Sequence, residues 1–191
     1  MNEKKLLLVV DMQNDFIDGS LGTPEAQAII PKVCEKIKNW DGKIRFTEDI
    51  HHPNYLKTQE GRNLPVEHCM CGTDGAKISG EIAKAYNSRN PDDEFPQSPV
   101  IYMKNAFGSR QMIEDMKKEE AYGGDFFTSV ELIGLCTDIC VISNAVLIKS
   151  FFPEIELSVD ASCCAGVTPQ SHKNALEAMK MLQIEIKNEE A

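Results

Sequence analysis

The sequence predicts an α/β fold in which helices cover both faces of a mostly parallel, six-stranded sheet. Short apolar runs alternate along the chain with segments of helical spacing, as is typical of right-handed strand–helix–strand units. The 191 residues suffice for one well-cored domain but are few for two, so we expect residues 1–191 to form a single domain. The expected strands lie at residues 6–10, 44–47, 100–103, 129–134, 156–159 and 184–186.

The first expected strand, residues 6–10, is continuously apolar, which indicates a strand covered on both faces. Helical spacing of apolar residues predicts helices at residues 24–39, 110–120, 139–151 and 168–181. Thr23 and Thr168 each precede a proline, and a capping side chain followed by proline favours a helix start. Two long segments, 48–75 and 87–98, fit neither pattern. Such loops are usually functional or mobile, and a lid or an interface loop is equally consistent with residues 87–98.

The formal net charge of −10 comes without a basic cluster, which argues against nucleic acid or an anionic membrane as a partner. Residues 6–10, the longest apolar run, are too few to cross a bilayer, and no signal-peptide cleavage site follows them. We therefore expect a cytoplasmic protein. Its seven cysteines are interpreted as reduced thiols, most of them small core residues such as Cys34, Cys163 and Cys164.

Charged residues follow two of the expected strands. In an open parallel sheet, ligands bind beyond the carboxyl ends of the strands, and Asp11 and Lys104 stand at two of these ends. Alone, the aspartate suits a turn and the lysine suits a strand that reaches solvent. Together, at what we expect to be neighbouring strand ends, they should pair, and each should lower the cost of burying the other.

Cys140 lies where the expected strand 129–134 runs into a helix. At a helix N-terminus, unpaired backbone N–H groups stabilise a thiolate and lower the pKa of a cysteine. The same N–H groups suit a developing oxyanion. The alternative is a buried structural cysteine, but this position favours a nucleophile.

The long segment 48–75 holds three of the four histidines. Asp49, His51 and His68 offer one oxygen and two nitrogens, a set typical of catalytic zinc, iron or manganese sites with open positions. Two alternatives stay open. The histidines are surface residues, or Cys69 and Cys71 join a structural zinc site, although their one-residue spacing is unusual for one.

Four motifs in order carry a family resemblance. Val-Asp-Met-Gln-Asn-Asp-Phe at 10–16, Met-Lys-Asn-Ala-Phe at 103–107 and Gly-Leu-Cys-Thr-Asp-Ile-Cys-Val at 134–141 resemble the isochorismatase-like cysteine hydrolase superfamily. Residues 49–51, 67–69 and 72–76 look like its nicotinamidase (pyrazinamidase) branch. The resemblance runs from about residue 5 to about residue 170 and implies a three-layer, Rossmann-like arrangement of the sheet.

The resemblance also implies roles for particular residues. It implies a catalytic triad of Asp11, Lys104 and Cys140, and a divalent metal, zinc before iron or manganese, on Asp49, His51 and His68. A cis peptide bond is implied between Leu135 and Cys136, with the backbone N–H groups of Cys136 and Cys140 as oxyanion donors. Substrate contacts are implied for Phe16, Leu21, Phe107 and Leu135.

The reaction implied by the resemblance is hydrolysis of nicotinamide to nicotinate and ammonia through a cysteine thioester, a step of NAD salvage carried out by a homo-oligomer. One departure bears on the substrate. Relatives that hydrolyse nicotinamide usually carry a ring-stacking aromatic residue just before the last metal histidine, and residues 63–67 contain none. Tyr55 is the candidate replacement. Two alternatives follow: an amidase for another small amide, such as a carbamoyl compound or ureide, and a non-catalytic binding or scaffold protein.

Overall fold

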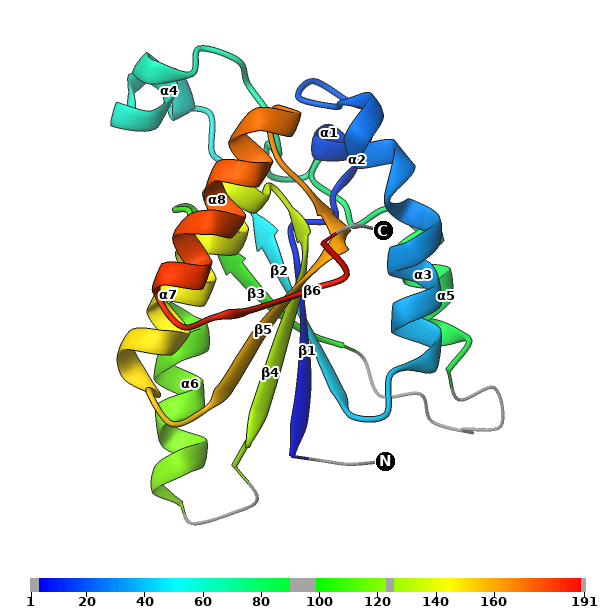
Figure 1. The fold of residues 1–191 in the computed structure, drawn as a ribbon. Helices are drawn as coiled ribbons and strands as arrows, with labels where there is room; N and C mark the ends of the chain where they lie inside the picture. Colours follow the sequence, from blue (N-terminus) through cyan, green and yellow to red (C-terminus); the bar gives the residue numbers. More distant parts are fainter. Residues whose placement is uncertain (1–3, 90–98, 123–125, 190–191) are drawn as a thin grey trace.

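Six strands form one sheet in the order β3-β2-β1-β4-β5-β6, and every pairing between them is parallel (Figure 1). The computed structural model describes residues 4–89, 99–122 and 126–189. Within it the strands are β1 (Lys5–Val10), β2 (Lys43–Asp49), β3 (Val100–Lys104), β4 (Ser129–Leu135), β5 (Glu156–Ala165) and β6 (Glu185–Lys187). The six expected strands are therefore confirmed, and the sheet is parallel throughout its described part.

Helices cover both faces of the sheet and give three layers (Figure 1). One face carries α6 (Arg110–Ala121), α7 (Ile142–Phe151) and α8 (Pro169–Met181). The other carries α3 (Ile30–Asn39) and α5 (Gly80–Asn87). Shorter helices follow the strands: α1 (Asn14–Ile17), α2 (Pro24–Ala28), η1 (Tyr55–Lys57), α4 (Gln59–Asn63) and the π-helical turn η2 (Thr137–Val141).

β1 lies between β2 and β4 in the sheet, and its side chains contribute to two hydrophobic cores, one on each face. Because successive side chains of a strand point to opposite faces, Leu6, Leu8 and Val10 pack against the α6–α8 layer. Leu7 and Val9 pack against the layer of α3 and α5. All five are completely buried, and burying each such side chain stabilises the fold by about 1.5–3 kcal/mol. The continuous apolar run therefore forms the doubly covered strand that it predicts.

The helix expected at residues 24–39 is wrong in one respect, because the structure breaks it into α2 and α3. Thr23 caps α2 by accepting a hydrogen bond from the Ala26 N–H at 3.0 Å. The break falls at Ile29, and Pro31 lies in the first turn of α3. Proline lacks an N–H group and its ring clashes with the carbonyl four residues earlier, so one continuous helix cannot form.

Other expected boundaries also change. The residues after Asp11 do form a short helix, α1, although the sequence showed no clear helical pattern there. The segment 48–75 is not wholly irregular, because η1 and α4 lie in it, and α5 follows it. The helix expected at 139–151 begins as η2 and continues as α7. Of the segment 87–98, residues 90–98 lie outside the described part of the chain.

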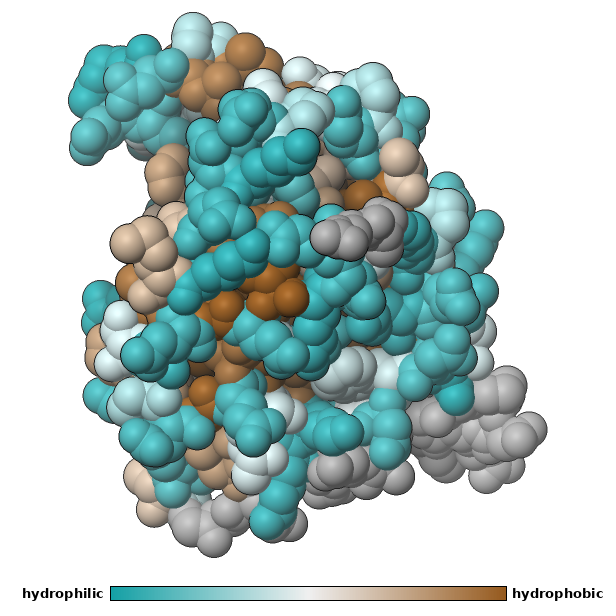
Figure 2. Space-filling model, in the orientation of Figure 1, coloured by the Kyte–Doolittle hydropathy of each residue, from teal (hydrophilic) through white to brown (hydrophobic). Residues whose placement is uncertain are grey.

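The carboxyl ends of the strands meet at one edge of the sheet, where α1, α2 and α4 lie above it (Figure 1). Figure 2 shows mostly hydrophilic residues on the face that α8 crosses, around a smaller apolar area. Within the described residues, every helix is too short or too polar to span a membrane.

Gly134 lies at the end of β4, just before the turn η2 that carries Cys140. Its φ is +118°, and a Cβ at this position would collide with the carbonyl oxygen of Val10 on β1. The strand register with β5 also shifts between Leu132 and Gly134. Glycine is required here by both conformation and space.

We expect Gly134→Ala to lower the free energy of unfolding by about 2–4 kcal/mol, since it combines a disfavoured φ with a backbone clash. Gly80→Ala is the matched control. Gly80 opens α5, nothing lies near its missing Cβ, and the substitution should stabilise the protein by up to about 1 kcal/mol. Urea unfolding of both variants measures the difference. Equal stability of the two variants would contradict the prediction.

Candidate active site

Four strands deliver polar side chains to the same edge of the sheet. Asp11 directly follows β1, Asp49 ends β2, Lys104 ends β3, and Cys140 lies in η2 after β4. The expectation that Asp11 and Lys104 stand on neighbouring strands is wrong, because β2 lies between β1 and β3. The long lysine side chain crosses the end of β2 to reach Asp11. Asp49, paired in register with Lys104, therefore belongs to the same cluster.

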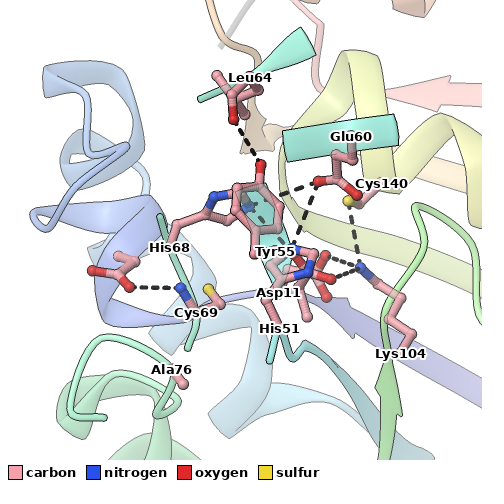
Figure 3. Close-up of polar contacts among 12 residues, drawn as sticks. Asp11, His51, Tyr55, Glu60, Leu64, His68, Cys69, Ala76, Lys104 and Cys140 are labelled. Carbon is pink, nitrogen blue, oxygen red and sulfur yellow. Dashed lines mark hydrogen bonds and ion pairs between the residues drawn. The ribbon is translucent and has the colours of Figure 1, made fainter. Parts of the chain in front are cut away.

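Asp11, Lys104 and Cys140 meet as predicted (Figure 3). Lys104 Nζ lies 2.6 Å from Asp11 Oδ2 and 3.5 Å from Cys140 Sγ. The exposed fractions are 0% for Asp11, 7% for Lys104 and 6% for Cys140. One ammonium group thus faces a carboxylate and a sulfur in a site almost closed to solvent.

Thr47 on β2 holds the Asp11 carboxylate in place, a contact that the sequence did not reveal. Its hydroxyl donates a hydrogen bond to Asp11 Oδ1 at 2.6 Å, and its Oγ1 also lies 3.2 Å from the Asp11 N–H. Asp11 has a φ of +47°, a conformation that aspartate tolerates better than most residues. Oδ2 forms an ion pair with Lys104 outside regular hydrogen-bond geometry. The two carboxylate oxygens therefore have different partners, Thr47 for Oδ1 and Lys104 for Oδ2.

Burial and charge set the protonation of the three groups. Burial raises the pKa of the Cys140 thiol well above its ordinary value, the Asp11 carboxylate raises it further, and Lys104 only partly opposes them. Burial also raises the pKa of Asp11. Burial alone would lower the pKa of Lys104, but Asp11 and Cys140 raise it instead. The expected low thiol pKa is therefore wrong: at rest Cys140 is a thiol and needs a base.

The turn that carries Cys140 has an unusual backbone. The peptide bond between Leu135 and Cys136 is cis, as the resemblance implied. The Cys136 carbonyl accepts hydrogen bonds from the N–H groups of Ile139 and Val141, at 3.1 and 3.0 Å. Asn144, fully buried on α7, donates to the Cys140 carbonyl at 2.8 Å. These bonds fix Cys136 and Cys140 beside the cavity described below.

A second cluster adjoins this site. Ligand atoms of Asp49, His51, Glu60 and His68 all lie within 4.8 Å of one another. His51 Nε2 is 2.8 Å and His68 Nε2 is 3.5 Å from Asp49 Oδ2. Glu60, on α4, reaches both histidines at 3.6 and 3.8 Å and was not among the predicted ligands. The only sign of this role in the sequence is that Glu60 is a carboxylate in the same segment, 48–75, as the histidines.

These residues fit a divalent cation. His51 Nε2 is buried and makes no hydrogen bond among the described residues, although it points into the cluster. His68 Nδ1 lies 2.8 Å from the Val66 carbonyl, so a hydrogen on Nδ1 leaves Nε2 as the free donor atom. Two imidazole nitrogens and two carboxylates suit zinc, iron or manganese.

The two alternatives for the histidine loop are now decided by position. His51 and His68 are buried, with 5% and 2% exposed, so they are not surface residues, unlike exposed His52. Cys69 and Cys71 stand outside the four-residue cluster, and all seven cysteines are free. A structural site built on these cysteines is not supported.

Two residues of the segment after β1 form hydrogen bonds that position the cluster of Asp49, His51, Glu60 and His68. Gln13, fully buried, brackets Asp49: its amide nitrogen donates to the Asp49 carbonyl and its amide oxygen accepts from the Asp49 N–H, both at 2.8 Å. Asp15 accepts a hydrogen bond from the Cys69 N–H, next to His68, at 2.7 Å. The first motif of the chain therefore supports both clusters.

A cavity of about 360 Å³ opens beside Cys140. Phe16, Leu21, Phe107 and Leu135, all implied as substrate contacts, line it. Its remaining lining residues are Thr23, Ala26, Asp49, Glu60, Asn63, Leu64, His68, Cys136, Ile139, Cys140, Gly166 and Val167. Charged or ionisable side chains of the second cluster stand in one part of this lining, and no lysine or arginine of the described residues is in it.

Tyr55 does not replace the missing ring-stacking residue, which corrects that expectation. Its ring packs on the rings of His51 and His68, with centroids 4.5 and 5.1 Å apart, and its hydroxyl donates to the Leu64 carbonyl at 2.9 Å. Tyr55 therefore supports the histidines and lines another cavity, of about 520 Å³. Leu64, from the segment that lacks an aromatic residue, lines the apolar cavity instead.

Comparison with known proteins decides the family. A model of the isochorismatase domain matches residues 5–187. The chain belongs to the isochorismatase family. This family member is a hydrolase of the isochorismatase superfamily, and its all-parallel α/β fold agrees with those of the family's solved structures.

Several relatives resemble this family member along nearly its whole length. The isochorismatase family protein PncA of Bacillus subtilis is 30% identical over 184 residues, which cover 91% of this chain and 92% of that protein. A crystal structure of the pyrazinamidase of Pyrococcus horikoshii in complex with zinc has a TM-score of 0.74 and 28% identity, covering 96% of this chain and 98% of that one. N-carbamoylsarcosine amidase of Thermoplasma acidophilum has a TM-score of 0.71 and 27% identity, with 98% of each chain covered.

Proposed function

We propose that this protein hydrolyses a small, neutral aromatic carboxamide, with nicotinamide as the leading candidate, to the carboxylate and ammonia. The observation that carries the proposal is the contact of Lys104 with both Asp11 and Cys140, at 2.6 and 3.5 Å, beside an apolar cavity. A sulfur next to a buried carboxylate suits nucleophilic attack on a carbonyl carbon. Relatives named as a pyrazinamidase and an amidase support the reaction class.

The first half of the proposed reaction moves one proton and forms one bond. Asp11 takes the proton of the Cys140 thiol, and the sulfur attacks the carbonyl carbon of the amide. The backbone N–H groups of Cys136 and Cys140 hold the oxyanion that develops. As the C–N bond breaks, Asp11 gives the proton to the nitrogen, which leaves as ammonia, and a thioester remains on Cys140.

The second half returns the enzyme to its starting state. Water attacks the thioester carbon while Asp11 takes a proton from it. The C–S bond breaks, the acid leaves, and the sulfur recovers the proton. In both halves Lys104 stays beside the negative charge, whether that charge sits on Asp11 or on the sulfur.

Asp49, His51, Glu60 and His68 would hold a divalent metal, for which zinc is the first candidate. When bound, such an ion supplies Lewis-acid chemistry and a fixed positive charge at one side of the cavity. Of these four residues, Asp49, Glu60 and His68 also line the cavity, so the ion would lie within reach of a bound substrate.

The charge of the cavity lining favours a neutral aromatic amide over the alternative, a carbamoyl compound. A carbamoyl amino acid carries a carboxylate, which needs a cationic partner once it leaves water. The carboxylates of Asp49 and Glu60 would balance the charge of a bound divalent ion, so the ion leaves no net positive charge for a substrate carboxylate. The rest of the described lining offers apolar side chains such as Phe16, Leu21 and Val167, without lysine or arginine. A planar, uncharged ring fits this surface better. The likeness to N-carbamoylsarcosine amidase nevertheless makes that substrate class the right comparison.

An ammonia-release assay tests the proposal. We expect kcat/KM for nicotinamide to exceed that for N-carbamoylglycine by about 100-fold or more, the effect of an unpaired buried charge of about 3 kcal/mol. Cys140→Ala should lower kcat for nicotinamide by about 10³-fold or more. Cys34→Ala is the matched control, because Cys34 lies on α3 outside the cavity lining, and should keep wild-type rates.

Two results would contradict the proposal. Near-wild-type ammonia release by Cys140→Ala would remove the nucleophile from the mechanism. A preference for N-carbamoylglycine over nicotinamide would replace the substrate class but keep the cysteine. Wild-type protein inactive on both, with and without added zinc, would favour a non-catalytic role.

Glu60 provides a separate test of the metal site. We expect Glu60→Gln to weaken zinc binding, because one of the four ligand groups loses its charge. Loss of an outer-shell partner costs about 10–100-fold in metal affinity, and loss of a ligand charge should cost at least as much. Glu67→Gln, an exposed change in the same loop, is the control and should bind zinc like wild type. Competition with a chromogenic chelator measures both affinities. Equal zinc affinity in Glu60→Gln and wild type would exclude Glu60 as a ligand.

A further inference from the structure

The π-helical turn η2, which carries Cys140, is held both by its own backbone and by neighbouring elements. The Cys136 carbonyl accepts two N–H groups of the turn, and the Ile142 N–H that follows bonds to the carbonyls of Ile139 and Thr137. A π-helical turn is a rare conformation that persists where the surroundings support it, often at functional sites. The contacts that hold η2 from outside therefore bear directly on where the Cys140 sulfur lies.

One of these contacts joins η2 to α8. Thr137, the first residue of η2, is completely buried, and its hydroxyl oxygen lies 2.8 Å from Nδ1 of His172 in the first turns of α8. Burial lowers the pKa of His172, so its ring is neutral near pH 7 and has one N–H group and one acceptor nitrogen. Either orientation of this bond satisfies a hydroxyl that lies three residues before Cys140.

A second contact, of a different kind, lies beside the first. The Asp138 carboxylate accepts a hydrogen bond from the Val167 N–H, with both oxygens within 3.3 Å. Gly166, just before it, allows the backbone of His172 to approach closely, because a Cβ on Gly166 would stand 2.8 Å from the His172 nitrogen. The segment from Gly166 to His172 thus contacts Thr137 and Asp138, two successive residues of η2. Gly166 and Val167 also line the cavity.

We propose that His172 is a positioning residue that holds η2, through Thr137, in the arrangement that brings Cys140 to Asp11 and Lys104. His172 does not line the cavity, so its effect passes through the turn rather than through the substrate. The outer side of α8 is hydrophilic and faces solvent in Figure 2, whereas His172 is half-buried on its inner side. The kinetic part of this inference rests on the proposed amidase function; the structural part does not.

Three variants separate positioning from packing. His172→Ala removes the hydrogen bond. His172→Asn places a polar atom near the position of Nδ1, whereas His172→Gln reaches the position of Nε2 and cannot bond Thr137 in the same way. Lys173→Ala, an exposed neighbour on α8, is the control.

Hydrogen–deuterium exchange of residues 137–141 is the first readout, because it needs no substrate. We expect exchange in this segment to rise by about 10-fold in His172→Ala and His172→Gln, and to return toward wild type in His172→Asn. The second readout is kinetic. His172→Ala and His172→Gln should lower kcat for nicotinamide by about 10-fold, the effect of one lost hydrogen bond. KM should change less than about 2-fold, because the bond positions the reacting sulfur and does not contact the substrate.

Several outcomes would overturn the inference. Unchanged exchange in residues 137–141 of folded His172→Ala would show that the bond does not hold the turn. Equal defects in His172→Asn and His172→Gln would indicate a packing role, and this comparison remains if His172→Ala fails to fold. A higher KM with unchanged kcat would indicate a contact with substrate instead. If the wild type hydrolyses no amide, the proposed function fails, and the exchange experiment alone still decides the role of His172.

Discussion

The ion pair between Asp11 and Lys104 is the interaction on which the site depends. A buried carboxylate costs several kcal/mol unless a charge of opposite sign compensates it, and Asp11 is wholly buried at the end of the central strand β1. Lys104 arrives from β3, two strands away, and places its ammonium group 2.6 Å from the carboxylate. The order of the strands, and not their sequence positions, brings the two charges together.

The same ammonium group explains how a thiol with a raised pKa can react. When the proton passes from Cys140 to Asp11, the negative charge moves from oxygen to sulfur, and the net charge of the three groups stays the same. Lys104 faces both positions of that charge. Burial raises the pKa of both the acid and the base, so it changes the transfer between them less than it changes the loss of a proton to water. A low thiol pKa at a helix N-terminus is not needed for this chemistry.

The sequence predicted the elements that local patterns determine. The apolar run before Asp11 and the strand-to-helix position of Cys140 placed both residues at the correct edge of the sheet. Apolar spacing predicted one helix over residues 24–39, but Pro31 divides it, because the spacing of apolar residues carries no information about a missing N–H group. Strand order decided that Asp11 and Lys104 are not neighbours, and order is a long-range property that no local pattern contains. Thr47 and Glu60 were missed for the same reason, since each joins the site only through tertiary contacts.

The pH dependence of Cys140 alkylation by iodoacetamide, followed by mass spectrometry, tests this account most directly. If Asp11 and the sulfur share one negative charge beside Lys104, replacing Asp11 by Asn removes a charge that opposes the thiolate. Cys140 should then react at a lower pH than in wild type, although its proposed base is gone. Cys71, the exposed cysteine, provides an internal reference. An unchanged or higher pKa of Cys140 in Asp11→Asn would contradict the account.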